Sequence, residues 1–206
     1  MLWNKKDNTV INKLEEFETY KLNNREIFID NISVGLANMI DGQIRVWNLL
    51  DDAIAVQDRE PIKIYINCDN GTLPTITTIL DAIKMSKTPV YTFNTGVVGM
   101  AALFVYLAGH KRYCYPMGVF HFDPTDFDLT PYDLNPTDSQ FYTMKDCLSV
   151  IHNELKRMLI EKTDIEETQL NKHMSHSWYI STEDAVKLRI CNEICRKHFK
   201  LEREER

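Results

Sequence analysis

The sequence lacks the features that would place the protein in a membrane, in the secretory pathway or on nucleic acid. No apolar run reaches the roughly 18–20 residues that a membrane-spanning helix needs, and the N-terminus shows no signal-peptide pattern. The formal net charge is −6, so no basic excess favours nucleic acid or an anionic membrane as a partner. Hydrophobic residues (44%) and charged residues (26%) occur at ordinary levels. The composition therefore indicates a globular protein with one substantial core.

The cysteine and histidine spacings that are typical of disulfide frameworks and metal sites are also missing. No two of the five cysteines form a CxxC pair; they are Cys68, Cys114, Cys147, Cys191 and Cys195. We therefore expect free thiols in a reducing compartment. His173 and His176 lie three residues apart, but no third ligand is evident in the sequence. We expect neither a metal nor another cofactor.

The order of segments along the chain predicts one α/β domain. Residues 1–24 are polar and mixed in charge, which predicts a flexible arm with one short helix. From residue 25 to 194, β-rich and helix-like segments alternate, as in repeated βαβ units with a largely parallel sheet. The expected segments are 25–29, 33–50, 62–66, 75–85, 89–93, 100–109, 113–115 and 119–122. Residues 195–206 are expected to form a charged tail.

The second half of the domain contains a long helix that exceeds what a small core requires. The stretch 124–136 is rich in proline and aspartate and predicts an acidic loop. Residues 137–161 then show an apolar stripe at helical spacing. A helix of about 25 residues spans nearly 40 Å, because each residue adds about 1.5 Å. We expect this helix to project from the domain and to pack on another copy. A short helix at 164–174, an extended piece at 178–180 and a helix capped by Ser181 follow.

The stretch from Thr92 to Gly109 is the clearest candidate for a functional site. An apolar strand leads into an expected tight turn at Gly96 and Gly99, and an apolar helix begins near Met100. Such a junction presents one side chain, and the free N–H groups of the helix, to a substrate. A methionine has no ionisable proton and cannot act as a serine-type nucleophile. The sequence therefore predicts an active-site scaffold without its nucleophile.

Four segments in the correct order together resemble the ClpP family, the proteolytic subunit of the ATP-dependent Clp protease. They are 25–43, with Ala37-Asn38 and Gln43; 65–71, where the family has Tyr-Ile-Asn-Ser-Pro-Gly-Gly; 92–109, where it has Thr-x-x-x-Gly-x-Ala-Ala-Ser-Met; and 178–185. The resemblance runs from about residue 25 to 194. It implies an α/β fold of the ClpP/crotonase type, with repeated βαβ units and a projecting long helix. The crotonase superfamily is a second, weaker resemblance.

The resemblance implies a Ser-His-Asp triad, and this chain departs from the family at each of its positions. The serine position corresponds to Met100, the histidine position to Phe122, counted back from Pro124, and the aspartate position to Ser177. His121 lies one residue away, on the opposite face of a regular strand, and a bulge would be needed to restore it. Loss of the triad serine alone costs on the order of 10⁶ in kcat. The resemblance therefore implies a subunit that does not cut.

The oxyanion loop of the family also differs here. Its two glycines correspond to Asn70 and Gly71, and we expect the Asn70 side chain to enter a groove that the family lines with backbone. Cys68 is the most tempting substitute nucleophile, because a thiol near His121 would be activated. We interpret it instead as a small buried thiol at the end of a strand.

The resemblance further implies partners. Family members form rings of seven subunits, two rings stack, and loops of an AAA+ unfoldase dock in apolar pockets. The docking positions correspond to Lys63, Tyr65, Phe93, Thr95, Tyr113 and Tyr115. The loop at 124–136 replaces a Gly-rich strand that is used for stacking, and His176 replaces an arginine that pairs across rings. We therefore expect contacts within a ring to be kept better than contacts between rings.

These observations favour a non-catalytic ClpR-type subunit in a homo- or hetero-heptameric ring, beside a catalytic ClpP subunit. Such subunits occur in cyanobacteria and plastid-type organelles, so we expect a plastid-type matrix, with the cytoplasm as the alternative. Two other functions stay open. One is an active ClpP-like serine endopeptidase with a shifted site. The other is a crotonase-like acyl-CoA-binding protein, for which Asp123 is a candidate base.

Overall fold

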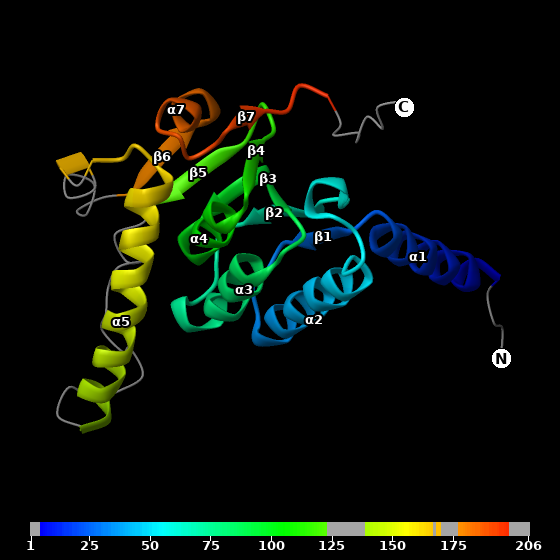
Figure 1. The fold of residues 1–206 in the computed structure, drawn as a ribbon, viewed down its shortest axis with the longest axis horizontal. Coiled ribbons are helices and arrows are strands. Elements are labelled where there is room, and N and C mark those ends of the chain that lie inside the picture. Colours follow the sequence, from blue (N-terminus) through cyan, green and yellow to red (C-terminus); the bar gives the residue numbers. More distant parts are fainter. Residues whose placement is uncertain (1–4, 123–138, 167, 170–176, 198–206) are drawn as a thin grey trace.

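The computed structural model describes residues 5–122, 139–166, 168–169 and 177–197 (Figure 1). The remaining residues, among them the acidic loop 124–136, most of the helix expected at 164–174, and His173 and His176, lie outside the described part of the chain. The elements are α1 (Lys5–Asn23), β1 (Glu26–Ile29), α2 (Val34–Leu50), η1 (Val56–Asp58), β2 (Ile62–Cys68), α3 (Leu73–Met85), β3 (Val90–Gly99), α4 (Met100–Ala108), β4 (Lys111–Cys114), β5 (Val119–Phe122), α5 (Ser139–Lys162), β6 (Trp178–Ser181), α7 (Thr182–Lys187) and β7 (Glu193–Ile194).

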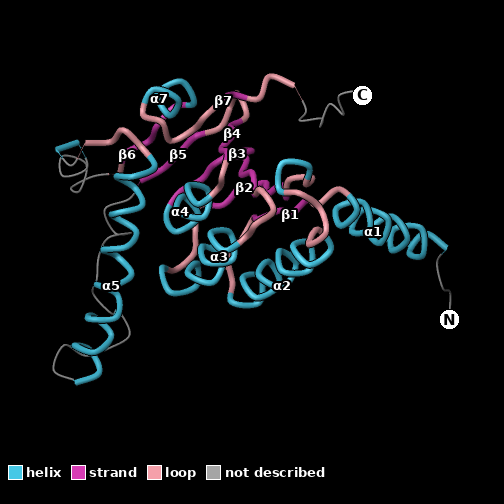
Figure 2. The backbone as a smooth tube through the Cα atoms, viewed as in Figure 1, coloured by secondary structure: helices cyan, strands magenta, loops and turns pink. Residues whose placement is uncertain are grey.

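The centre of the fold is a mostly parallel sheet with the order β1-β2-β3-β4-β7. Strand β5 pairs in parallel with the end of β3, and β6 pairs antiparallel with β5. Helices α2, α3 and α4 lie side by side along the sheet (Figure 2). The alternation of strands and helices that the sequence predicts is therefore present, and the crossovers through α2, α3 and α4 each join two parallel neighbouring strands.

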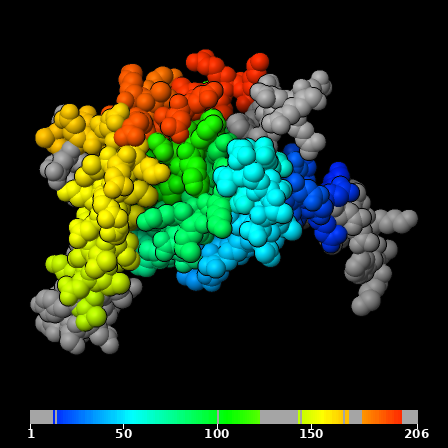
Figure 3. Space-filling model, in the orientation of Figure 1, coloured from blue at the N-terminus to red at the C-terminus, as the bar shows by residue number. Residues whose placement is uncertain are grey.

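The main core lies between the sheet and these helices. It is built largely from isoleucine on the strands and on α2 and α3, and from nearly every residue of α4. Residues 101–107 are each at most 2% exposed, which explains why α4 is apolar on all its faces. Helix α5 joins this core through Leu155 and Leu159 and extends beyond it along one side of the molecule (Figure 3). None of the helices in the described ranges is both long and apolar enough to span a bilayer.

Strand β3 continues through the tight turn that the sequence predicts at Gly96 and Gly99, so that prediction is wrong. The first half of β3, residues 91–94, pairs with β4, and residues 97–99 pair with β5. Asn94 lies where the partner changes: its Nδ2 donates to the Val119 carbonyl at 2.9 Å, and its Oδ1 accepts from the Gly96 N–H at 3.0 Å. These side-chain hydrogen bonds take the place of backbone bonds between strands where β3 changes its partner from β4 to β5, and the strand stays extended there.

Gly96 is required here by a close approach rather than by a turn. The Oδ1 atom of Asn67 accepts a hydrogen bond from the Val97 N–H at 2.9 Å. A Cβ atom on Gly96 would overlap that same oxygen. The glycine therefore makes room for the side chain that joins the end of β2 to the end of β3.

Several helix boundaries follow from capping residues in the sequence. Ser33 caps α2 by accepting from the Leu36 N–H at 3.2 Å, and Ser181 caps α7 by accepting from the Asp184 N–H at 3.2 Å. The cap that the sequence predicts at Ser181 is confirmed. Within the expected arm 1–24, α1 is a helix of 19 residues, longer than the short helix predicted there. Strand β7, with two residues, was not predicted.

Candidate functional site

The candidate site lies where β3 runs directly into α4. Gly99 is the N-cap of α4 in an extended conformation (φ −143°), and Met100 is the first helical residue. The side chain of Met100 lies outside the described part of the structure. The first N–H groups of α4 have no partner within their own helix, as at the start of any helix. The backbone therefore provides the strand-to-helix junction that the sequence predicts, without the turn.

Strand pairing brings the three positions that the resemblance assigns to the triad to the same edge of the sheet. Gly99 is the register partner of His121, and Met100 and Phe122 are the residues that directly follow this pair on α4 and β5. Phe122 is the register partner of Trp178, and the exposed residue Ser177 directly precedes that strand. The topology therefore assembles the positions, although the side-chain types do not form a triad.

His121 and Phe122 point to opposite faces of β5. Phe122 is 4% exposed, belongs to the main core, and has its ring centroid 5.8 Å from that of Trp178. The pairing of β5 with β6 is regular from Val119 to Phe122, so it contains no bulge that would turn His121 to the face of Phe122. The imidazole therefore lies on the face of β5 opposite to Phe122.

The His121 side chain contacts Asp69 and Tyr179. Its Nδ1 atom lies 2.9 Å from the Oδ1 atom of Asp69, and its ring is stacked on that of Tyr179 with centroids 4.3 Å apart and planes parallel. The residue is 7% exposed, and its Nε2 atom is shielded from solvent. A general base needs a nitrogen that can reach the substrate. In this geometry the imidazole is tied to the loop after β2 and to β6.

Sequence reasoning missed the bond between Asp69 and His121. The available signal was topological, because Asp69 follows β2 and His121 lies near the end of β5, and the carboxyl ends of parallel strands meet at one edge. The bond ties the loop at 68–71 to β5. It is therefore a new feature of the candidate site.

The Asn70 side chain binds the segment before α2, a pairing that the sequence does not predict. Its Oδ1 atom accepts from the Ile32 N–H at 3.1 Å and lies 3.2 Å from the Cys68 thiol. Its Nδ2 atom donates to Asn31 at 2.9 Å. The side chain is therefore turned toward the segment that precedes α2, because partners for both ends of its amide lie there.

Gly71 brings the same loop against the first turn of α4. Its φ of +115° is a conformation that residues with a Cβ rarely adopt, and an added Cβ would lie 3.1 Å from the Cβ of Ala101.

Cys68 is 3% exposed, and burial raises the pKa of its thiol. A thiol with a raised pKa is a poor nucleophile at neutral pH, which agrees with its interpretation as a structural residue.

Three of the expected docking positions, together with Phe28, form an aromatic ladder across four parallel strands. The ladder consists of Phe28, Tyr65, Phe93 and Tyr113, which are successive register partners on β1, β2, β3 and β4. Their ring centroids are 4.9, 4.8 and 4.9 Å apart in that order, and each pair is stacked. These distances match the spacing of strands, about 4.8 Å, so the sheet itself sets the stacking.

Most of the expected docking side chains are covered in this chain. Tyr65, Phe93 and Tyr113 are at most 8% exposed, and burial raises the pKa of Tyr113 to about 12, so its phenol is neutral. Lys63 is 5% exposed and lies 3.6 Å from a Glu26 oxygen. The other two positions, Thr95 and Tyr115, are half-buried. The structure thus brings these positions together but leaves only part of them open.

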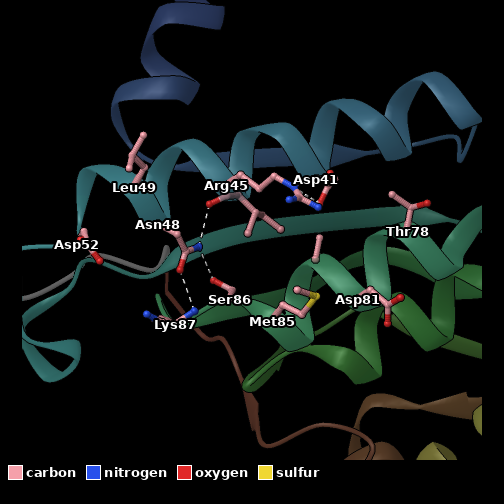
Figure 4. A pocket seen from close by; sticks show the side chains of 12 residues that line it. Asp41, Arg45, Asn48, Leu49, Asp52, Thr78, Asp81, Met85, Ser86 and Lys87 are labelled. Atoms are coloured by element: carbon pink, nitrogen blue, oxygen red, sulfur yellow. Dashed lines mark hydrogen bonds and ion pairs between the residues drawn. The ribbon is translucent and has the colours of Figure 1, made fainter.

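A groove of about 620 Å³ lies between α2 and α3, away from the junction of β3 and α4 (Figure 4). Leu49 and Met85 stand on its two sides and are 76% and 74% exposed. Between them, Asn48 donates to Ser86 and accepts from the Lys87 N–H, each at 2.8 Å. The groove therefore combines the hydrogen-bonded amide of Asn48 with the exposed apolar side chains of Leu49 and Met85. No group of three potential metal ligands occurs among the residues that the structure describes.

Comparison with known proteins identifies similar sequences along most of the chain. A family model described as Clp protease matches residues 15–198. The ATP-dependent Clp protease proteolytic subunit 2 of Treponema denticola is 24% identical over 176 residues, which are 85% of this chain and 84% of that protein. The protein of the same name from Borreliella burgdorferi is 23% identical over 150 residues, or 72% and 73% of the two chains.

Solved structures show the same fold. A ClpP1 mutant from Listeria monocytogenes superposes with a TM-score of 0.68 at 24% identity and covers 88% of this chain and 97% of that chain. A peptidase from Plasmodium falciparum gives a TM-score of 0.67 at 20% identity, over 87% and 100% of the two chains. The predicted α/β fold with repeated βαβ units is confirmed.

Proposed function

This chain belongs to the Clp protease family, and from that premise we propose that it is a non-catalytic subunit in the ring of an ATP-dependent Clp protease. The observation that carries the proposal is the residue at the start of α4, where a methionine stands at the serine position of the family. A thioether cannot form the acyl-enzyme intermediate of a serine peptidase.

The surroundings of the junction support the same proposal. The histidine position is filled by Phe122 in the main core, and the nearby imidazole of His121 is engaged by Asp69. Ser177 stands at the aspartate position and carries no charge that would orient an imidazole. Each of the three roles of the triad thus lacks the required side chain.

The proposal assigns the chain a place in a ring with a catalytic proteolytic subunit. The exposed side chains of Leu49 and Met85, at the groove between α2 and α3, offer an apolar surface on the flank of the domain for contacts within the ring. The aromatic ladder, with its exposed end at Phe28, is the surface on which an AAA+ unfoldase would dock. A subunit of this kind would form part of the wall of a degradation chamber and part of the surface on which an unfoldase docks.

A labelling experiment tests the absence of catalysis. The purified protein is treated with a fluorophosphonate probe and with a fluorogenic peptide, beside a catalytic proteolytic subunit as the positive control. We expect no covalent adduct and no peptide turnover above background for this chain. A stable adduct, or turnover that the probe abolishes, would overturn the proposal.

A second experiment tests the place in a ring. The chain is co-expressed with a catalytic proteolytic subunit, purified by a tag on this chain, and examined by light scattering. We expect a complex that contains both subunits and cleaves the fluorogenic peptide. Recovery of this chain as a monomer without the catalytic subunit would contradict the assignment.

A further inference from the structure

The aromatic ladder has one end that is open to solvent. Phe28 is 45% exposed, whereas the next ring, Tyr65, is 8% exposed, because Phe28 lies on the edge strand β1 and has a ladder neighbour on one side only. A side chain that stacked on the free face of Phe28 would extend the ladder by one ring. The open end is therefore the part of the ladder that a further aromatic or aliphatic group can reach.

Helix α1 already places a ring at this end. The ring centroid of Phe17 lies 6.0 Å from that of Phe28, with planes tilted by 46°. The Nζ atom of Lys21 lies 5.0 Å from the Phe17 ring and 5.9 Å from the Phe28 ring. Phe17 remains 48% exposed, so the contact covers the ladder end only in part. The tilted geometry also differs from the stacked rings inside the ladder.

The connection between α1 and β1 is held in place by hydrogen bonds of Arg25. Arg25 has a φ of 54°, which ends the helix abruptly, and its guanidinium donates to both oxygens of Asp51 at 2.5 and 2.6 Å. It also donates to the Glu60 carbonyl at 3.0 Å. The anchor fixes the start of β1, while α1 is attached to the sheet through Phe17 and Lys21. A change in the position of α1 would thus leave β1 and the ladder in place.

We infer that α1 is a displaceable cover of the aromatic ladder, and that Phe17 occupies the place of an apolar side chain from a docking partner. The inference rests on the proposed docking of an unfoldase at this surface. Neighbouring rings in the ladder are stacked with centroids 4.8–4.9 Å apart, whereas the Phe17 ring is tilted on Phe28 at 6.0 Å. An incoming aromatic or leucine-sized side chain that stacked on Phe28 would displace Phe17 and release α1 from the sheet.

The cover is tested first without a partner, using the anionic fluorescent dye ANS as a probe for open aromatic surface. Phe17→Ala and Lys21→Ala are compared with Thr19→Ala, an exposed position on α1 that makes no contact with Phe28 among the contacts described. We expect Phe17→Ala to bind the dye roughly five-fold more tightly, since a tilted aromatic pair contributes about a factor of two to ten. Thr19→Ala should match the wild type. Equal dye binding by wild type and Phe17→Ala would overturn the inference.

A second variant locates the site. Adding Phe28→Ala to Phe17→Ala should remove the gain in dye binding, because the ring on which the probe stacks is gone. Hydrogen exchange measured by mass spectrometry should show faster exchange of residues 5–23 in Phe17→Ala than in Thr19→Ala. A gain that persists without Phe28 would place the dye elsewhere and overturn the inference.

A third measurement separates the cover from the proposed function. An AAA+ unfoldase is titrated onto the assembled complex of wild type or Phe17→Ala with the catalytic subunit. Tighter binding by Phe17→Ala supports the cover, and equal binding overturns it. If neither assembly binds the unfoldase while dye binding and exchange respond as expected, the docking role fails and the cover stands.

Discussion

Asp69 and His121 are joined by a contact of 2.9 Å between Oδ1 and Nδ1, although 52 residues separate them in the sequence. The contact closes the loop after β2 onto the end of β5. In an active serine peptidase, an imidazole near this junction would face a hydroxyl. Here the described contact of the imidazole is with Asp69 in the loop after β2.

Removing this contact should destabilise the loop. We expect Asp69→Ala to lower the free energy of unfolding by about 1 kcal/mol, because His121 is 7% exposed and loses a bonded partner. For a chain of this size the melting temperature should fall by about 2–4 °C. Asp81→Ala, at an exposed position on α3, is the control and should change little. Identical melting curves for wild type and Asp69→Ala would show that the contact contributes nothing.

Restoring a serine should not restore activity. We expect Met100→Ser to remain unlabelled by a fluorophosphonate and inactive on a fluorogenic peptide, because Phe122 and Ser177 still occupy the positions of the base and its orienting acid. Met100→Ala is the matched control and should be indistinguishable from it. Labelling of Met100→Ser that disappears when His121 is also replaced would show that His121 acts as a base after all.

The course of the strands and helices could be predicted because it depends on local patterns. The caps at Ser33 and Ser181 and the all-apolar α4 are each encoded within a few residues. The path of β3 could not be predicted in this way, because glycines usually indicate a turn. Gly96 is instead needed for the close approach of Asn67, which lies 29 residues earlier in the chain. A long-range contact thus overrode a local signal.

The sequence assigns positions to the candidate site, but it does not reveal the contacts there. The alignment of the segments assigns Met100 and Phe122 to triad positions, and that assignment needs no tertiary information. The orientation of Asn70 depends on partners at Asn31 and Ile32, which no local pattern reveals. For the same reason the pairing of Asp69 with His121 required the structure.

The buried ion pair between Arg25 and Asp51 should carry a large part of the stability of the joint before β1. Asp51 is fully buried and also accepts from the Thr88 hydroxyl at 2.8 Å. Arg25→Ala would leave that carboxylate without its main partner, and we expect a loss of about 3–5 kcal/mol in the free energy of unfolding. The control is Arg45→Ala, which breaks an i,i+4 pair with Asp41 and should cost about 0.5 kcal/mol or less.

The same pair predicts a dependence on pH. The hydrogen bond from Arg25 lowers the pKa of Asp51 below its usual range. The resulting stabilisation is fully present above the unfolded pKa of about 3.9 and is lost as the pH falls through the lower folded value. We therefore expect the difference in unfolding free energy between wild type and Arg25→Ala to be constant from pH 5 to 7, roughly, and to shrink below about pH 4. A difference that does not change with pH would contradict this role of Asp51.

The groove between α2 and α3 provides the last prediction, on assembly. Leu49 and Met85 are among the most exposed apolar side chains of the described residues, so replacing either with aspartate should leave the folded monomer nearly unchanged. Burying a charge within a subunit contact costs several kcal/mol, so Leu49→Asp and Met85→Asp should shift the complex with the catalytic subunit toward free chains in light scattering. Met117→Asp alters a side chain that is 90% exposed on a different surface and serves as the control. If all three variants assembled like the wild type, the ring contact would have to lie on another face of the domain.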